Sequence, residues 1–227
     1  MTHYALIPTF NEEENIEEVI LRLRKYKNVN IIVIDDGSTD STPEIVKKLG
    51  TILVRHEINK GKGEAIKTGF EYILKNHPEA KYIVLIDADM QYFPEEAGKI
   101  LKPLEENEAD YVTGYRNPKS IPYANRIGNF GWRVLFNLFF GTNLKDTNCG
   151  YIGMTKEAMK KIKNIHGGYI IENTMLSDAV KNKLRIKQVP VKVIYRQRKI
   201  RKFARMFFGV LIFIIIEGLK FRIGIES

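Results

Sequence analysis

Short apolar runs alternate with helical patterns over the first 115 residues of the chain. The apolar runs predict strands over residues 4–7, 30–34, 51–54, 82–86 and 110–113. Between them, apolar side chains recur at helical spacing and predict helices over residues 12–27, 43–49, 59–74 and 94–104. Because this alternation indicates βαβ units, we expect an α/β fold: a Rossmann-like, doubly wound, mainly parallel sheet with helices on both faces.

The second half of the chain has a less regular pattern. Residues 127–140 are aromatic and apolar, which predicts a helix that is either core or partly exposed at a binding face. A further helix is expected over residues 168–183, with Glu172 near its start. Residues 186–195 alternate after Pro190 and predict a strand. No repeat or linker divides these segments.

Polar clusters follow three of the expected strands, at Pro8–Glu12, Asp35–Ser38 and Asp87–Gln91. In a parallel sheet the carboxyl ends of the strands meet at one edge, where such folds bind ligands. The alternative is that βα loops are polar in any case. Acid-bearing loops on one edge favour a nucleotide-binding crevice.

The cluster after the fourth strand carries two carboxylates, Asp87 and Asp89. Residues i and i+2 of a strand point to the same side, so persistent extended geometry would aim both side chains at one spot. Two oxygen ligands suit Mg²⁺ or Mn²⁺, which take the rest of their shell from water and substrate phosphates. An Asx turn is the alternative interpretation, and the motif alone leaves the two even.

The net charge of +9 is concentrated in one segment. Residues 179–216 contain 11 Lys or Arg and no acid, whereas the rest holds 25 basic and 27 acidic side chains. A uniformly basic chain would suggest nucleic acid, but here the charge leads into the uncharged, apolar stretch Met206–Ile216. We therefore expect an anionic membrane surface as partner and no nucleic acid.

The apolar stretch Met206–Ile216 is too short for a spanning helix, which needs about 20 residues. We expect a domain over residues 1–202 and an amphipathic, interfacial C-terminal helix over 203–227 with no full transmembrane span. A core helix is the alternative. No signal peptide is recognisable and Cys149 is the only cysteine, so we expect a cytoplasmic protein bound peripherally to the cytoplasmic face of the cell membrane.

Several motifs occur in a familiar order. They are Ile7-Pro-Thr-Phe-Asn-Glu12, Val33-Ile-Asp-Asp-Gly-Ser-Thr-Asp40, Asn59-Lys-Gly-Lys-Gly63 and Asp87-Ala-Asp-Met-Gln91. Together they resemble the family 2 glycosyltransferases, which have the GT-A fold. Further segments resemble the branch of dolichyl-phosphate mannose synthase and related polyprenyl-phosphate glycosyltransferases: Gly114-Tyr-Arg116, Asn125-Arg126, Asp146-Thr-Asn-Cys-Gly150, Glu172 and residues 196–202.

The resemblance implies a role for individual residues. The implied nucleotide-sugar contacts are Pro8, Phe10, Glu12, Ile34, Asp36, Asp87, Ala88, Asp89, Arg116, Arg196 and Lys202. The implied metal ligands for Mg²⁺ or Mn²⁺ are Asp87, Asp89 and Gln91. Arg126 and Arg198 would bind the acceptor phosphate, and Asp89, Arg116 and Asp146 are the candidate catalytic residues.

The implied reaction is an inverting, metal-dependent sugar transfer from a nucleotide sugar, with GDP-mannose favoured, to a polyprenyl or dolichyl phosphate at the membrane surface. A phosphate nucleophile is already anionic and needs no strong general base. If the acceptor were a sugar hydroxyl, with UDP-glucose or UDP-N-acetylglucosamine as donor, Asp146 would be the first candidate base by position. Its alternative is a loop acid that binds backbone amides. A sugar nucleotidyltransferase is disfavoured, because the loop after the first strand is not glycine-rich.

Overall fold

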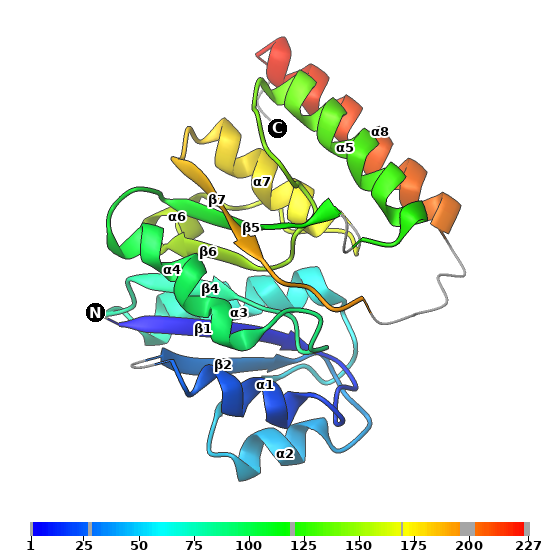
Figure 1. Cartoon of the computed structure of the whole chain (residues 1–227). Helices are drawn as coiled ribbons and strands as arrows, with labels where there is room; N and C mark the ends of the chain where they lie inside the picture. Colours follow the sequence, from blue (N-terminus) through cyan, green and yellow to red (C-terminus); the bar gives the residue numbers. More distant parts are fainter. Residues whose placement is uncertain (1, 27–28, 119–120, 169, 196–202, 225–227) are drawn as a thin grey trace.

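The computed structural model describes residues 2–26, 29–118, 121–168, 170–195 and 203–224. Within these ranges seven strands form one sheet in the order β3-β2-β1-β4-β6-β5-β7 (Figure 1). They are β1 (His3–Thr9), β2 (Val29–Asp35), β3 (Ile52–Arg55), β4 (Tyr82–Leu85), β5 (Tyr111–Arg116), β6 (Ile152–Thr155) and β7 (Ile186–Val191).

The sheet is mainly parallel, as predicted. β1 pairs in parallel with β2 and β4, β2 with β3, and β5 with β7. β6 is antiparallel to both β4 and β5, between which it is inserted. The sequence pattern did not predict β6, because its four residues, Ile-Gly-Met-Thr, show neither an apolar run nor an alternation.

Helices follow most strands. They are α1 (Ile16–Leu23), α2 (Thr42–Lys48), α3 (Lys62–Asn76), α4 (Ala97–Glu105), α5 (Tyr123–Phe140), α6 (Lys156–Lys161), α7 (Ile171–Lys181) and α8 (Phe203–Arg222). A short 3₁₀ turn, η1 (Pro94–Glu96), precedes α4. α1 is shorter at both ends than the expected helix, and the expected strand over residues 186–195 already ends at Val191.

Side chains of β1 alternate between two cores, which shows that the sheet is doubly wound. Tyr4 and Leu6 face the cluster formed with α3, α5, α6, α7 and α8. Ala5 and Ile7 face the cluster formed with α1, α2 and α4. Burying both faces of a strand requires a continuous apolar run, and this is what the sequence has at residues 4–7.

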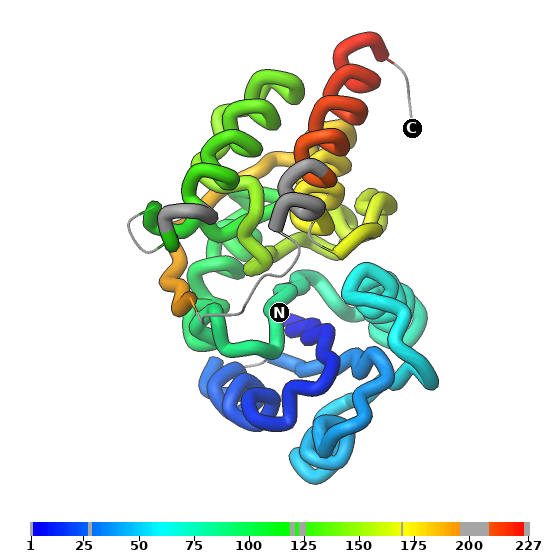
Figure 2. Tube along the Cα trace, turned by 90° about the vertical axis from the view of Figure 1, so that its right-hand side faces the viewer, coloured from blue at the N-terminus to red at the C-terminus, as the bar shows by residue number. Residues whose placement is uncertain are grey.

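α5 and α8 lie side by side and run in the same direction at the end of the molecule opposite α2 (Figures 1 and 2). Phe140 of α5 stacks on Phe221 of α8 with ring centroids 5.4 Å apart. Arg222 Nε donates to the carbonyl of Phe139 at 2.8 Å. Among the described residues, no helix is long and apolar enough to cross a membrane.

The strand order distinguishes one place at the centre of the carboxyl edge of the sheet. From β1 the chain moves outward through β2 and β3, and it then returns to add β4 on the other side of β1. This reversal is the topological switch point, where open α/β sheets bind ligands. The loops after β1 and β4 therefore flank the expected site.

Candidate active site

Hydrogen bonds join the loops after β1 and β2 into one unit. The amide of Asp36 donates to the carbonyl of Thr9 at 2.8 Å. The amide of Asn11 donates to Ser38 Oγ at 2.9 Å, and its side-chain oxygen accepts from the amide of Thr39 at 2.8 Å. Asn11 adopts a left-handed φ of 52°, a conformation uncommon outside glycine. These contacts hold the loops after β1 and β2 together beside the switch point.

Asp36 organises the loop that leads into α3. Its carboxylate accepts from the amides of Lys60 and Gly61 at 2.9 and 2.7 Å. His56 Nδ1 lies 2.7 Å from Asp36 Oδ1, and both side chains are buried. Asp36 thus holds the start of α3 toward the crevice, and its contact with a nucleoside stays a prediction.

The other residues expected to contact the nucleoside lie around the same loops. Pro8 and Ile34 are buried at the carboxyl ends of β1 and β2, whereas Phe10 is 43% exposed just beyond β1. Glu12 is half-buried. The amide of Glu12 donates to Thr42 Oγ1 at 2.9 Å. An exposed aromatic ring beside a buried strand end is available for stacking on a base.

The acidic pair lies in a loop and not in the strand, because β4 ends at Leu85 and Ala88 and Asp89 are in a turn. The amide of Gln91 donates to Asp89 Oδ1 at 3.1 Å, so Asp89 makes the Asx turn that the sequence left as an alternative. Met90 has a φ of 57°. Asp87, Asp89 and Gln91 are half-buried and Ala88 is buried.

Asp87 shares a lysine with a second carboxylate. Lys62 Nζ, at the start of α3, lies 2.7 Å from Asp87 Oδ1 and 3.1 Å from Glu172 Oε1, in the first turn of α7. Burial alone would lower the pKa of Lys62, but the two carboxylates outweigh it and raise the pKa above its usual value. Residues from three elements therefore meet at this point.

Gly150 forms a wall of this acidic cluster. A Cβ at position 150 would lie 3.1 Å from Asp87 Oδ2 and 3.4 Å from Glu172 Oε1. The amide of Gly150 donates to the hydroxyl of Tyr92 at 3.0 Å. The lack of a side chain lets the segment after Cys149 approach the carboxylates closely.

Arg116 and Asp146 form a separate, buried ion pair at the end of β5. Arg116 Nε and Nη2 donate to Asp146 Oδ2 and Oδ1 at 2.7 and 2.9 Å. The amides of Arg116 and Asn148 also donate to Asp146, at 3.1 and 3.0 Å. Burial by itself would raise the pKa of Asp146, but Arg116 outweighs it and holds the pKa below its usual value. A carboxylate with these donors is a weak base.

The segment after β7 connects both centres. Tyr92 pairs with Val193 in an isolated bridge, and the amide of Ile194 donates to the carbonyl of Gln91 at 2.9 Å. Arg116 Nη1 donates to the hydroxyl of Tyr195 at 3.1 Å. The residues before position 196 thus run directly beside the candidate site.

Not every predicted phosphate-binding residue can be placed. Arg196, Arg198 and Lys202 lie outside the described residues. Arg126 is exposed in the first turn of α5. The assignment of these four residues to phosphates stays a prediction.

A divalent cation at Asp87–Gln91 would need ligands from water or substrate in addition to those of the protein. No group of three or more His, Cys, Asp or Glu side chains that could hold a metal occurs in the described parts of the chain. Mg²⁺ and Mn²⁺ sites that handle phosphates use one or two carboxylates, and water and substrate oxygens complete the shell. The half-buried carboxylates of Asp87 and Asp89 fit that type of site.

Sequence reasoning assigned no role to Lys62 or Glu172, although both lie in recognised segments. They are separated by 110 positions, so periodicity could not bring them together. The available signal was a lysine between two glycines at a helix start. Such a lysine is placed where backbone amides and side chain can meet an anion.

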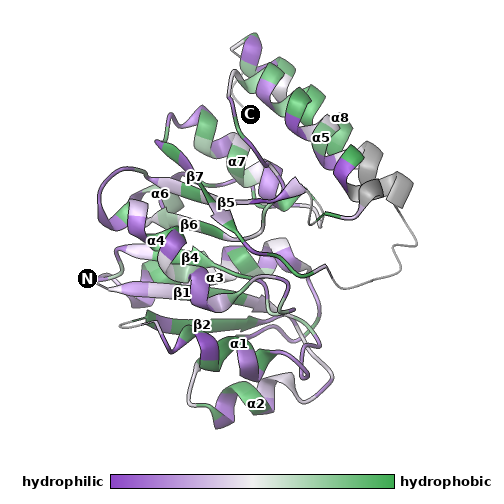
Figure 3. Cartoon of the chain, in the orientation of Figure 1, coloured by the Kyte–Doolittle hydropathy of each residue, from purple (hydrophilic) through white to green (hydrophobic). Residues whose placement is uncertain are grey.

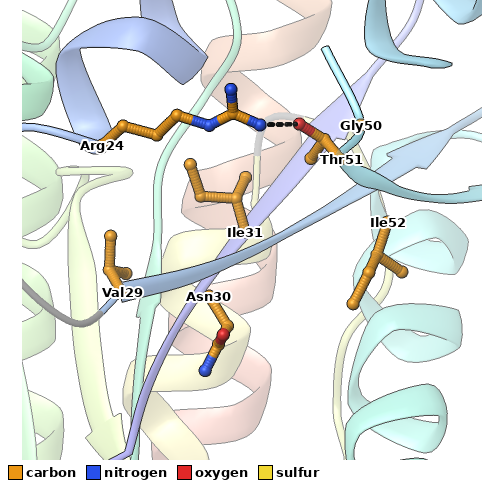
Figure 4. Close-up of a pocket in the computed structure, with 7 residues that line it drawn as sticks. All are labelled: Arg24, Val29, Asn30, Ile31, Gly50, Thr51 and Ile52. Carbon is orange, nitrogen blue, oxygen red and sulfur yellow. Dashed lines mark hydrogen bonds between the residues drawn. The ribbon is translucent and has the colours of Figure 1, made fainter. Parts of the chain in front are cut away.

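A hollow at the opposite edge of the sheet is distinct from this site. It is lined by Arg24, Val29, Asn30, Ile31, Gly50, Thr51 and Ile52, at the amino ends of β2 and β3 (Figure 4). Arg24 Nη2 donates to Thr51 Oγ1 at 3.1 Å and so braces the hollow internally. None of the predicted site residues borders it.

Comparison with known proteins identifies relatives along most of the chain. The sequence model for glycosyl transferase family 2 matches residues 4–163. An uncharacterised protein of Methanocaldococcus jannaschii is 37% identical over 201 residues, covering 86% of this chain and 82% of its own length. A UDP-N-acetylglucosamine–dolichyl-phosphate N-acetylglucosaminyltransferase of Methanococcus voltae is 32% identical over 243 residues, covering 96% and 95%.

Solved structures share the fold. Glucosyl-3-phosphoglycerate synthase of Mycobacterium tuberculosis, in complex with Mn²⁺, UDP and phosphoglyceric acid, superposes with a TM-score of 0.78. The match covers 100% of this chain and 80% of the synthase at 23% sequence identity. At that identity the likeness establishes the architecture, which is the GT-A fold expected from the sequence.

Proposed function

The chain belongs to glycosyltransferase family 2, and we propose that it transfers a sugar from a nucleotide sugar to a polyprenyl phosphate of the dolichyl phosphate type. The acidic loop Asp87–Gln91, placed at the switch point beside the loops after β1 and β2, is the observation that carries this proposal. The Methanococcus voltae relative supports the acceptor class, because its name specifies dolichyl phosphate.

Two donors are compatible with these observations. The resemblance to dolichyl-phosphate mannose synthase favours GDP-mannose. The name of the Methanococcus voltae relative instead specifies UDP-N-acetylglucosamine, and that relative matches nearly the whole chain. GDP-mannose therefore stays a prediction, and UDP-N-acetylglucosamine is the second candidate.

In the proposed reaction, an oxygen of the acceptor phosphate attacks the anomeric carbon and the bond to the nucleoside diphosphate breaks, with inversion. Asp87, Asp89 and Gln91 would hold Mg²⁺ or Mn²⁺, which offsets the charge that develops on the leaving diphosphate. Phe10 offers its exposed ring to the base, and the loops after β1 and β2 provide rigid walls.

Arg116 contributes a fixed positive charge near the leaving group in this proposal. Its bidentate pair with Asp146 holds the guanidinium in one orientation, and Nη1 faces Tyr195. Preorganised charge of this kind stabilises a transition state without reorganisation. Arg116 binds Asp146 and holds its pKa below the usual value, so Asp146 is a weak base. This favours an anionic phosphate acceptor over a hydroxyl, because a hydroxyl needs a base.

Exposed apolar side chains on α5 and α8 support a membrane-docking surface. Both helices consist largely of hydrophobic residues (Figure 3), and each keeps exposed apolar residues at helical spacing. On α5 they are Ile127, Phe130, Val134 and Leu138, and on α8 they are Ile212, Ile216, Leu219 and Ile223. The same helices bury other apolar residues in the core, such as Phe136 and Ile214. α8 is thus packed on the domain by one side and exposed on another.

Charge on this helix pair favours an anionic surface. α5 carries two arginines and no acid. On α8, the one acidic residue, Glu217, is paired with Lys181 and Lys220 at 2.7 and 2.8 Å. Each basic residue near an anionic membrane contributes about 1 kcal/mol, and apolar side chains add to that. We propose peripheral attachment to the cytoplasmic face of the cell membrane.

The activity is tested with a panel of nucleotide sugars, with and without polyprenyl phosphate, in the presence of Mg²⁺ or Mn²⁺. We expect release of nucleoside diphosphate and a glycosylated lipid phosphate from one donor only. Asp89→Ala should abolish turnover. A chain that is active without polyprenyl phosphate, on a sugar hydroxyl, would contradict the acceptor assignment.

Attachment is tested by co-sedimentation with vesicles of anionic or neutral lipid at low and high salt. We expect binding to anionic vesicles at low salt, weakened about threefold or more by Leu138→Ser or Ile216→Ser. Leu21→Ser, which changes a 45% exposed apolar residue on α1, is the matched control. Failure of the wild-type chain to bind anionic vesicles at any salt would exclude the membrane proposal.

A further inference from the structure

Lys62 is placed as a cation within the proposed metal site. Its Nζ lies 2.7 and 3.0 Å from the two oxygens of Asp87, so the ammonium bridges both oxygens of a proposed metal ligand. The side chains of Lys62 and Asp87 are 30% and 26% exposed. A divalent cation that used both Asp87 oxygens would therefore have to displace the ammonium.

Glu172 offers the same ammonium a second place. Its Oε1 lies 3.1 Å from Lys62 Nζ, and its side chain is only 15% exposed. Glu172 belongs to the first turn of α7, where the helix dipole stabilises a carboxylate. Gly150 lies against both carboxylates. Because it has no Cβ, no side chain at this position separates Asp87 from Glu172.

The charges in this cluster do not balance. One lysine, Lys62, faces two carboxylates, Asp87 and Glu172, within hydrogen-bond distance. A half-buried excess of negative charge is costly unless a further cation compensates it. The described side chains of the cluster therefore lack one positive charge that would balance its carboxylates.

We infer that Lys62 is a positioning residue: it occupies Asp87 while no divalent cation is bound, and Glu172 retains it when a cation takes Asp87. This inference rests on the proposed function, because it presumes that Asp87 is a metal ligand. It adds that the chain carries an internal competitor for its own metal. Divalent cations should accordingly bind weakly without nucleotide. When the donor is bound, its diphosphate adds negative charge, which favours the divalent cation over the ammonium of Lys62 at Asp87.

The test is the affinity of the full chain for Mn²⁺, measured without nucleotide by electron paramagnetic resonance. Lys62→Met removes the competitor, and we expect Mn²⁺ to bind about tenfold more tightly than to the wild type. Glu172→Gln removes the second place of the ammonium and should weaken Mn²⁺ binding about threefold or more, because Lys62 then stays on Asp87. A lysine that does not occupy the metal site would leave the Mn²⁺ affinity unchanged when it is replaced.

Lys67→Met is the matched control. Lys67 lies on the same helix and pairs with Glu64 at 2.7 Å, away from the cluster, so its loss should leave Mn²⁺ affinity unchanged. Thermal unfolding provides a second readout that also reports on folding. Mn²⁺ should raise the Tm of Lys62→Met more than that of the wild type, since a ligand that binds more tightly stabilises more.

The outcomes separate this inference from the proposed function. Equal or weaker Mn²⁺ binding by Lys62→Met overturns the role of Lys62, even where the wild type transfers sugar in a metal-dependent way. Absence of Mn²⁺ binding in both proteins overturns it as well. Tighter binding by Lys62→Met supports it, whereas failure of the wild type to release nucleoside diphosphate from any donor contradicts only the proposed function.

Discussion

Two ionic centres lie at the carboxyl edge of the sheet, and they are built differently. Arg116 and Asp146 form a bidentate pair whose side chains are 9% and 6% exposed. Lys62 faces Asp87 and Glu172, with side chains that are 30%, 26% and 15% exposed. Among the described side chains, the first centre is balanced and closed, and the second is open and has one more carboxylate than it has cations.

This difference determines which of the two centres can exchange ions. A closed pair with both oxygens occupied by donors has no coordination left for a ligand, so its contribution is to hold Arg116 in place. An open cluster with more carboxylates than cations can accept a divalent ion. Substitution in the first centre should therefore lower stability as well as turnover, because Asp146 holds Arg116 in place, whereas substitution in the second should lower mainly turnover.

Among the variants that compare the two centres, Asp87→Asn is expected to give the largest effect. It removes one charge from the open centre, and turnover should fall about 10³-fold because the leaving diphosphate loses its metal. The Tm should change little, since Asp87 is half-buried and Lys62 keeps Glu172. The measurement is nucleoside diphosphate release at saturating donor. Glu64→Gln, an exposed acid that pairs with Lys67, is the control, and a comparable loss there would contradict the assignment.

Asp146→Asn should produce the next largest effect, on stability. It leaves the buried guanidinium of Arg116 without its counter-charge, which costs about 3 kcal/mol in comparable buried pairs. The free energy of unfolding is measured in urea. A loss of turnover in Asp146→Asn without a loss of stability would reverse the contrast between the two centres.

Asp110→Asn is a matched control for this experiment. Arg185 Nε and Nη2 donate to Asp110 at 3.0 and 2.8 Å, and the amide of Arg185 donates as well at 2.9 Å. The geometry repeats that of Arg116 and Asp146, but the Arg185 side chain is 50% exposed. Since solvent screens an exposed pair, Asp110→Asn should destabilise the protein far less.

The pH dependence of stability should distinguish the closed centre further. The pKa of Asp146 is lower in the folded protein than its ordinary value of 3.8, because of Arg116. The stability it contributes is therefore present above that value and is lost as the pH falls through the folded pKa. The difference in unfolding free energy between the wild type and Asp146→Asn should thus be constant above about pH 5 and narrow below about pH 4. A difference that is unchanged down to pH 2 would contradict the ion-pair origin.

The regular half of the chain was the more predictable half. Apolar runs such as residues 4–7 and 82–86 predicted strands because both faces of the sheet are buried, and the polar clusters after them lie at one edge as expected. β6 was missed because its strand is short and its pairing depends on β4 and β5, which are distant in sequence. Local pattern carries no information on such an insertion.

The same limit applies to the site. Asp87 and Asp89 were found because they are two positions apart in the sequence, although both follow the end of the strand and Asp89 makes an Asx turn. The partner of Asp87 is Lys62 of α3, which also pairs with Glu172 of α7, and the partner of Arg116 comes from the segment before β6. Such contacts are fixed by tertiary packing, so a sequence can identify the residues without their partners.

Gly150→Ala should give the smallest effect and the sharpest contrast with Gly114→Ala. The added Cβ at position 150 would lie 3.1 Å from Asp87 Oδ2, so the carboxylate must shift by a few tenths of an ångström. We expect Mn²⁺ affinity to fall about threefold with little change in Tm.

At position 114 the Cβ would lie 2.7 Å from Val191 Cγ2 and 2.8 Å from Cys149 Sγ, in the packed core behind Arg116. There overpacking should cost about 1–3 kcal/mol of stability. Calorimetry and Mn²⁺ titration of both variants measure this, and a large loss of Tm in Gly150→Ala would show that the second centre is closed as well.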